Sequence, residues 1–81
     1  MCINSIKTNL PSERRDLDYI QSTLRNLLKT DRVEEAYYFY GVAQGYINGC
    51  RWLELDSWAY LVGLAKKVCE SKLNNLYSSN I

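Results

Sequence analysis

Histidine is absent from this 81-residue chain, and proline, cysteine and glycine occur only one, three and four times. Without histidine the chain has no histidine general base, no Ser–His or Cys–His nucleophile pair, and few ways to build a zinc or iron site. So little proline and glycine leaves little room for long loops. No segment approaches the roughly 18 apolar residues that a membrane-spanning helix needs.

The composition favours a folded chain of one domain. Hydrophobic residues make up 47% of the sequence and charged residues 23%, which is typical of a globular protein. Ten basic and nine acidic residues give a net charge of +1, a smaller basic excess than proteins that coat a phosphate backbone carry. A chain this short buries only about 60% of its unfolded surface. We therefore expect a homodimer.

The three cysteines favour a reducing compartment. Cys2, Cys50 and Cys69 are odd in number and lack the spacing of a metal site. The chain also starts without the apolar segment of a signal peptide. We expect free thiols and a cytoplasmic protein, with a Cys50–Cys69 disulfide as the alternative.

Apolar residues recur at helical spacing in three segments, which predicts helices over residues 12–29, 32–49 and 57–77. Short connections favour antiparallel neighbours. The expected fold class is all-α, a small three-helix bundle built on an antiparallel hairpin of the second and third helices. Residues 1–11 are expected to form a flexible arm, residues 12–77 the domain and residues 78–81 a frayed tail.

Specific residues are expected at the helix ends. Asp31 and Glu34 have the spacing of a capping box at the start of the second helix, and Gly49 is expected to end it. Either Asp56 or Ser57 is expected to cap the third helix. If Asp56 is the cap, Leu55 is placed to pack against Tyr60.

Glycines recur every four residues on one side of the second helix. Gly41, Gly45 and Gly49 lie opposite its apolar stripe, beside Glu34 and Tyr38. Each interior glycine costs about 0.5–1 kcal/mol of helix stability relative to alanine. Three interpretations stay open: close packing against the first helix, a groove for a helix of a second subunit or target, and no role at all.

Four successive aromatic residues, 37–40, cover nearly the whole circumference of the same helix. Phe39 and Tyr40 are best explained as core residues, whereas Tyr37 and Tyr38 are candidates for an interface, where tyrosine is favoured. Trp52, in the following connector, closes the end of the core or acts as an exposed anchor. The candidate partner-binding residues are Tyr37, Tyr38, Gly41, Gly45 and Trp52.

A group of basic residues gives the alternative function. These side chains lie on the polar side of the first helix, where they form a solvated surface or contact nucleic acid. No helix-turn-helix, zinc module or ribonucleoprotein motif accompanies them. The candidate nucleic-acid-binding residues are Arg14, Arg15, Arg25 and Lys29.

Motifs of catalysis are missing. The sequence has no phosphate-binding glycine loop, no G-x-S-x-G elbow and no diagnostic carboxylate pair. We expect no enzyme activity, no cofactor and no metal site.

Residues 36–49, Ala-Tyr-Tyr-Phe-Tyr-Gly-Val-Ala-Gln-Gly-Tyr-Ile-Asn-Gly, are followed by Trp52-Leu53 and Trp58. This segment resembles short helical-hairpin proteins of bacteriophages, plasmids and mobile elements of enterobacteria, whose helix reads roughly A-x-x-F-x-G-x-x-x-G-Y-I-x-A. The resemblance covers residues 32–70 and departs at Gly49-Cys50, where the pattern has Ala-Leu. It implies a mobile-element origin and no particular activity, and small proteins of that origin often inhibit or adapt host machinery, including defence systems.

The leading hypothesis is a non-enzymatic protein–protein interaction module with a protein partner and no membrane partner. The resemblance makes it a phage- or mobile-element-encoded inhibitor or regulator of a host complex. The first alternative is a small nucleic-acid-binding transcriptional regulator that uses the basic side of the first helix. The second is a purely structural oligomeric subunit.

Overall fold

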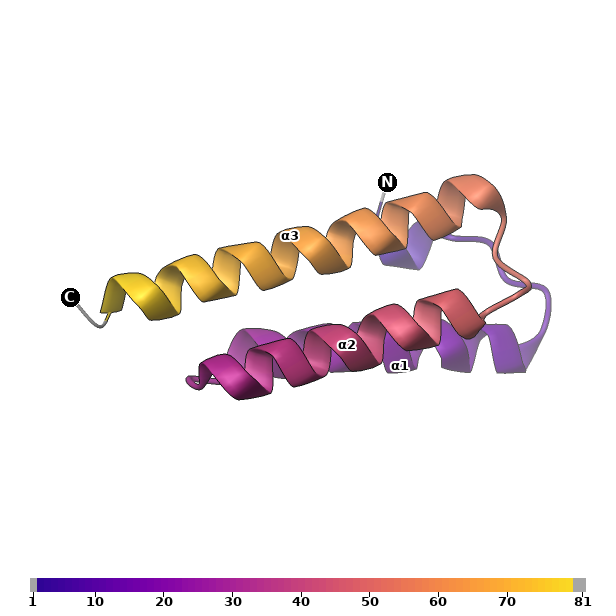
Figure 1. The fold of residues 1–81 in the computed structure, drawn as a ribbon. Coiled ribbons are helices and arrows are strands. Elements are labelled where there is room, and N and C mark those ends of the chain that lie inside the picture. Colours follow the sequence, from indigo (N-terminus) through magenta and orange to yellow (C-terminus); the bar gives the residue numbers. More distant parts are fainter. Residues whose placement is uncertain (1, 80–81) are drawn as a thin grey trace.

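The computed structural model describes residues 2–79 and contains three α-helices preceded by one short 3-10 helix. The elements are η1 (Ile3–Ser5), α1 (Pro11–Lys29), α2 (Val33–Gly49) and α3 (Leu55–Ser79), and no strand occurs among the described residues. Consecutive helices run in opposite directions (Figure 1). The predicted all-α class and the antiparallel α2–α3 hairpin are therefore confirmed.

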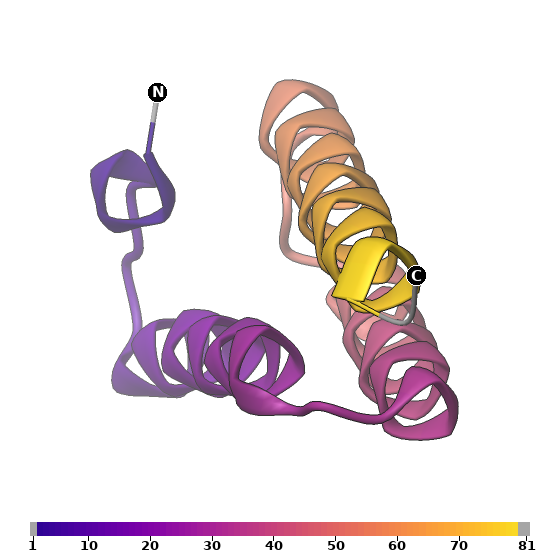
Figure 2. The same ribbon diagram turned by 90° about the vertical axis from the view of Figure 1, so that its left-hand side faces the viewer.

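The three helices form an elongated bundle of 47 × 18 × 18 Å. Viewed along its length, α1 and α2 lie side by side, α3 lies against α2, and η1 lies above α1, on the same side of the α1–α2 layer as α3 (Figure 2). Helix α2 therefore has α1 on one flank and α3 on another, and a third side that no element of the described chain covers.

The core lies where the apolar sides of the three helices meet. The five largest fully buried side chains come from the expected helical stripes, and each contributes about 1.5–3 kcal/mol by its burial. At the margins of the core, Leu28, Tyr46 and Trp58 were expected on these stripes but are exposed. The fully buried set consists of Leu17, Ile20, Leu27, Ile47 and Leu61.

The N-terminal segment is part of the core, and its description as a flexible arm outside the domain is wrong for the described residues. Ile3 and Ile6 are only 7% and 5% exposed and belong to the same apolar cluster as Leu17 and Ile20. Their spacing of three residues puts both side chains on one side of η1. Because this segment has no repeated apolar pattern of its own, its sequence gave no sign of the burial.

Helix α1 begins at a chain reversal that its own third residue stabilises. Pro11 is the first helical residue, where a missing N–H costs nothing. The Glu13 carboxylate accepts hydrogen bonds from the backbone N–H groups of Asn9, at 2.7 Å, and Leu10, at 3.3 Å. This carboxylate also lies near the positive end of the helix dipole.

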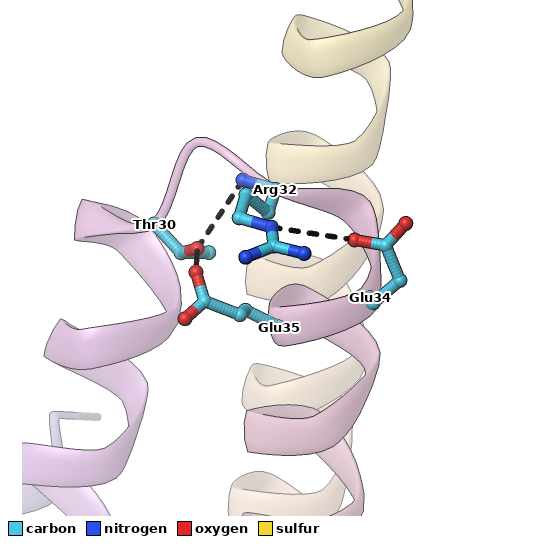
Figure 3. Close-up of polar contacts among 4 residues, drawn as sticks. All are labelled: Thr30, Arg32, Glu34 and Glu35. Atoms are coloured by element: carbon cyan, nitrogen blue, oxygen red, sulfur yellow. Dashed lines mark hydrogen bonds and ion pairs between the residues drawn. The ribbon is translucent and has the colours of Figure 1, made fainter.

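The expected capping box of Asp31 and Glu34 is not formed. The cap of α2 is Arg32, without a side-chain cap bond, and Thr30 stabilises the turn instead. The Thr30 hydroxyl accepts from the Arg32 N–H at 3.3 Å and donates to Glu35 Oε1 at 2.8 Å, while Glu34 forms an ion pair with Arg32 (Figure 3). Thr30 prevails because it is buried at 8% exposure, whereas Asp31 is exposed.

The third helix starts earlier and ends later than its capping signals indicate. It begins at Leu55, where the Trp58 N–H donates to the Glu54 carbonyl at 2.8 Å, so neither predicted cap precedes it. Leu55 is 76% exposed instead of packing inward. The helix continues to Ser79, so the first two residues of the predicted tail are helical, and residues 80–81 lie outside the described part.

All three cysteines are free thiols, as expected, and the Cys50–Cys69 disulfide is not formed. Cys50 and Cys69 are buried and Cys2 is exposed. In the described part of the chain, none of the helices combines the length and the apolar character needed to cross a membrane.

Candidate functional site

One side of α2 is exposed and is not packed against another helix of the described chain. Glu34, Tyr38, Gly41, Gly45 and Gly49 follow one another at intervals of three or four residues, which places them along one side of the helix. All five are exposed. We call these five residues the α2 outer face.

The glycines of this face do not serve packing inside the chain. A Cβ atom built on Gly41, Gly45 or Gly49 would meet nothing within 4 Å. The interpretation that α1 crosses α2 at the glycines is therefore wrong. Helix α1 instead packs against the side of α2 that carries the buried residues Ala43 and Ile47. The stability that these glycines cost α2 is not recovered by any contact in the described chain.

Two tyrosines that were predicted for an interface are exposed. Tyr38 is 66% exposed and makes an edge contact with Phe39, with ring centroids 5.5 Å apart. Tyr37 is 53% exposed and lies beside Tyr77 of α3, also 53% exposed, whose charge raises the pKa of the Tyr37 hydroxyl. Together these rings extend the apolar surface from the α2 outer face toward the end of α3.

A second cluster, which the sequence did not reveal, joins α1 to the end of α2. The Asp16 carboxylate accepts a hydrogen bond from the Tyr46 hydroxyl at 2.7 Å and another from the Trp52 indole N–H at 2.8 Å. The Tyr46 ring also lies 4.5 Å from the Tyr19 ring, centroid to centroid. We call Asp16, Tyr46 and Trp52 the Asp16 cluster.

The cluster moves the pKa values of its groups further from neutral pH. The bonds from Tyr46 and then Trp52 lower the pKa of Asp16, and the same bond to Asp16 raises the pKa of Tyr46 to about 12. Desolvation raises the pKa of the neighbouring Cys50 to about 11. A thiol with this pKa is almost entirely protonated at pH 7 and is a poor nucleophile.

The structure therefore separates Trp52 from the other predicted partner-binding residues. Trp52 is half-buried, packs against the core and donates to Asp16. This arrangement corresponds to the core-closing role, one of the two roles considered for it. Tyr37, Tyr38, Gly41 and Gly45 are all on α2 and all exposed.

Sequence reasoning also missed a second contact at the same end of the hairpin, next to the connector. The Trp58 indole N–H donates to Asn48 Oδ1 at 2.9 Å, which ties the first turn of α3 to the last turn of α2. The Asp16 partners are 30 and 36 residues away in sequence, so no local pattern pointed to them.

The basic residues of α1 form a separate surface. Arg15, Arg25 and Lys29 are exposed. Arg14 is half-buried, and its guanidinium donates to the Ile6 carbonyl at 3.5 Å, so it contributes to holding the N-terminal segment. Exposed Asp18 lies among them on the same helix.

Nothing in the described residues gathers the ligands of a metal site: no group of three or more histidine, cysteine, aspartate or glutamate side chains is suitably placed. The comparisons with known proteins add no functional information. The chain matches no protein-family model, no curated protein and no solved structure.

Proposed function

We propose that this chain is a non-enzymatic protein–protein interaction module that binds its protein partner through the α2 outer face. In this proposal it acts in the cytoplasm as a phage- or mobile-element-encoded inhibitor or regulator of a host complex, and the protein bound at the α2 outer face is a second copy of the chain, a host protein or both in turn. The observation that carries the proposal is the position of Tyr38, which is 66% exposed beside glycines where an added Cβ atom would meet nothing within 4 Å.

Physical chemistry supports a partner at this face. Tyrosine is enriched among the residues that dominate binding energy, because its ring buries a large area at a low entropic cost. Glycine allows a partner backbone to approach closely. The loss of helix stability at Gly41 and Gly45 is then compensated when a partner binds, not when the chain folds.

The matched variants Gly45→Leu and Gly63→Leu test this proposal. Both glycines are exposed helical residues with nothing within 4 Å of an added Cβ, but Gly63 lies on α3. We expect both variants to keep the helical circular dichroism spectrum. We expect the wild-type chain and Gly63→Leu to associate, with a second copy or with another protein, and only Gly45→Leu to lose this association; light scattering and copurification measure it.

The proposal fails if Gly45→Leu keeps the fold and also keeps every association of the wild-type chain. A nucleic-acid regulator is the second candidate, since Arg15, Arg25 and Lys29 are exposed on α1. Duplex DNA binding that weakens steeply with salt, and that Arg15→Glu with Arg25→Glu abolishes, would favour this second candidate. A purely structural subunit would self-associate and bind nothing else.

A further inference from the structure

We propose that the occupant of the α2 outer face is a second copy of the chain, docked antiparallel about a two-fold axis level with residue 43. This inference rests on the proposed function, because it identifies the partner of the same face. Three independent properties of the face support it: its pattern of side-chain sizes, its charges and its dimensions.

When the two-fold axis relates two copies of α2, large side chains of one copy lie opposite small residues of the other. An axis level with residue 43 places Gly41 opposite Gly45 of the second copy, because each is two residues from the axis. It places Tyr38 opposite Asn48 and Gly49 of the second copy. An exposed ring then lies over exposed glycine, and because the contact is two-fold it occurs twice.

The charges are complementary in the same register. Glu34 lies nine residues before the axis level, about 13.5 Å along the helix, and Arg51 lies on the other side, two residues after Gly49, the last residue of α2. The rotation therefore brings Glu34 of each copy to Arg51 of the other. Arg51 is the sole basic residue in the segment 33–56, which has four acidic ones.

Both charged groups are available for this pairing. Arg51 is exposed and makes no ion pair with any residue in the described part. Glu34 has one partner, Arg32, at 3.6 Å, but the two side chains are 80% and 67% exposed. Such an exposed pair contributes little to folding, so Glu34 can turn to a new partner without a large loss.

The dimensions of the molecule allow an interface of sufficient size. A stable interface of standard size buries roughly 800 Å² on each partner. The bundle is 47 Å long and 18 Å wide. Tyr37 and Tyr77, each 53% exposed, widen the apolar area on the α3 side of the face.

Charge reversal with mixing tests the register. In Glu34→Arg, both intersubunit contacts join two basic groups, and in Arg51→Glu both join two acidic groups. We expect each variant alone to self-associate roughly ten-fold more weakly than the wild type at low salt. In a one-to-one mixture, each contact joins opposite charges, so we expect the mixed dimer to regain the wild-type affinity.

The matched controls are Asp18→Arg and Arg25→Glu, which make the same charge changes on exposed residues of α1. We expect neither control to weaken the dimer, and their mixture to show no preference for the mixed pair. Analytical ultracentrifugation gives the dissociation constants, and native mass spectrometry gives the share of mixed dimer.

The outcomes separate this inference from the proposed function. A wild-type chain that stays monomeric at all concentrations overturns the second copy as the occupant, but leaves the face open to a different protein. A dimer whose mixed pair gains no affinity overturns this register. A dimer that Gly45→Leu leaves intact overturns the use of the face itself.

Discussion

The two sides of α2 differ in how far the rest of the chain buries and contacts their side chains. On the inner side, Ala36, Ala43 and Ile47 are fully buried, and Tyr46 donates to Asp16 of α1. On the outer side, Tyr38 is 66% exposed, and a Cβ atom added to the glycines beside it would meet nothing within 4 Å. The inner side explains why the chain folds, whereas folding alone does not explain the residues on the outer side.

We propose that the two sides of α2 serve different requirements, folding on the inner side and binding on the outer side. Residues chosen for stability alone would be good helix formers on an exposed helical surface, where alanine or lysine costs least. The outer side instead carries glycines and a large aromatic ring. That combination is consistent with a surface made for contact with another chain.

The largest expected difference between the two sides is in folding stability. We expect Ile47→Ala to lower the free energy of unfolding by about 2–5 kcal/mol, because it leaves a cavity in the core. We expect Tyr38→Ala to change the unfolding free energy of the monomer by less than about 0.5 kcal/mol. Urea unfolding measures the free energy of unfolding of both variants. Similar decreases in the two variants would contradict the distinction between a folding side and a binding side of α2.

The Asp16 cluster gives the next largest effect. Asp16→Ala leaves the Tyr46 hydroxyl and the Trp52 indole N–H without their acceptor. We expect it to lower the unfolding free energy by about 1–2 kcal/mol, since hydrogen bonds to a charged group are stronger than neutral ones. Asp18→Ala is the control, on an exposed carboxylate of the same helix. Equal effects of the two substitutions would show that the cluster does not stabilise the fold.

The same carboxylate makes stability depend on pH. Because folding lowers the pKa of Asp16 below 3.8, its contribution is present above the pKa of the unfolded chain and is lost as pH falls through the folded pKa. We expect the stability gap between wild type and Asp16→Asn to be full at about pH 6 and to shrink below about pH 4. Urea titrations at the two pH values measure this difference in unfolding free energy. A difference that grows as the pH falls would contradict the prediction.

The smallest expected effect on stability comes from replacing an exposed helical glycine with alanine, and it separates stability from binding. We expect Gly45→Ala and Gly63→Ala each to raise the unfolding free energy by about 0.5–1 kcal/mol, because the added methyl group meets nothing within 4 Å and alanine favours the helix. We expect only Gly45→Ala to weaken association. Thermal unfolding and light scattering separate the two effects, and association weakened equally by both would remove the special role of α2.

The helices were predictable because their signal is local. Apolar residues at helical spacing predicted helices over 12–29 and 32–49, and the structure has Pro11–Lys29 and Val33–Gly49. The exposure of Tyr37 and Tyr38 also followed from local geometry, since four successive aromatic side chains cannot all face one core.

The sequence did not predict the contacts between residues that are far apart in the chain. Ile3 and Ile6 are buried because α1 and η1 meet, which no periodicity near residue 3 indicates. Asp16 has its partners in α2 and in the connector after it, 30 and 36 residues away, where no local pattern indicates them. The Asp31 capping box failed because buried Thr30 competes for the same turn.

Photocrosslinking from residue 38 tests most directly whether the α2 outer face contacts another protein. A benzophenone amino acid replaces Tyr38 in one variant and Leu28 in the other, which is 51% exposed on α1 and serves as the control. After irradiation in the native host cell, we predict a discrete protein crosslink from position 38, to a second copy or another protein, and none from position 28. Equal crosslinking from both positions, or none from position 38, would contradict the account.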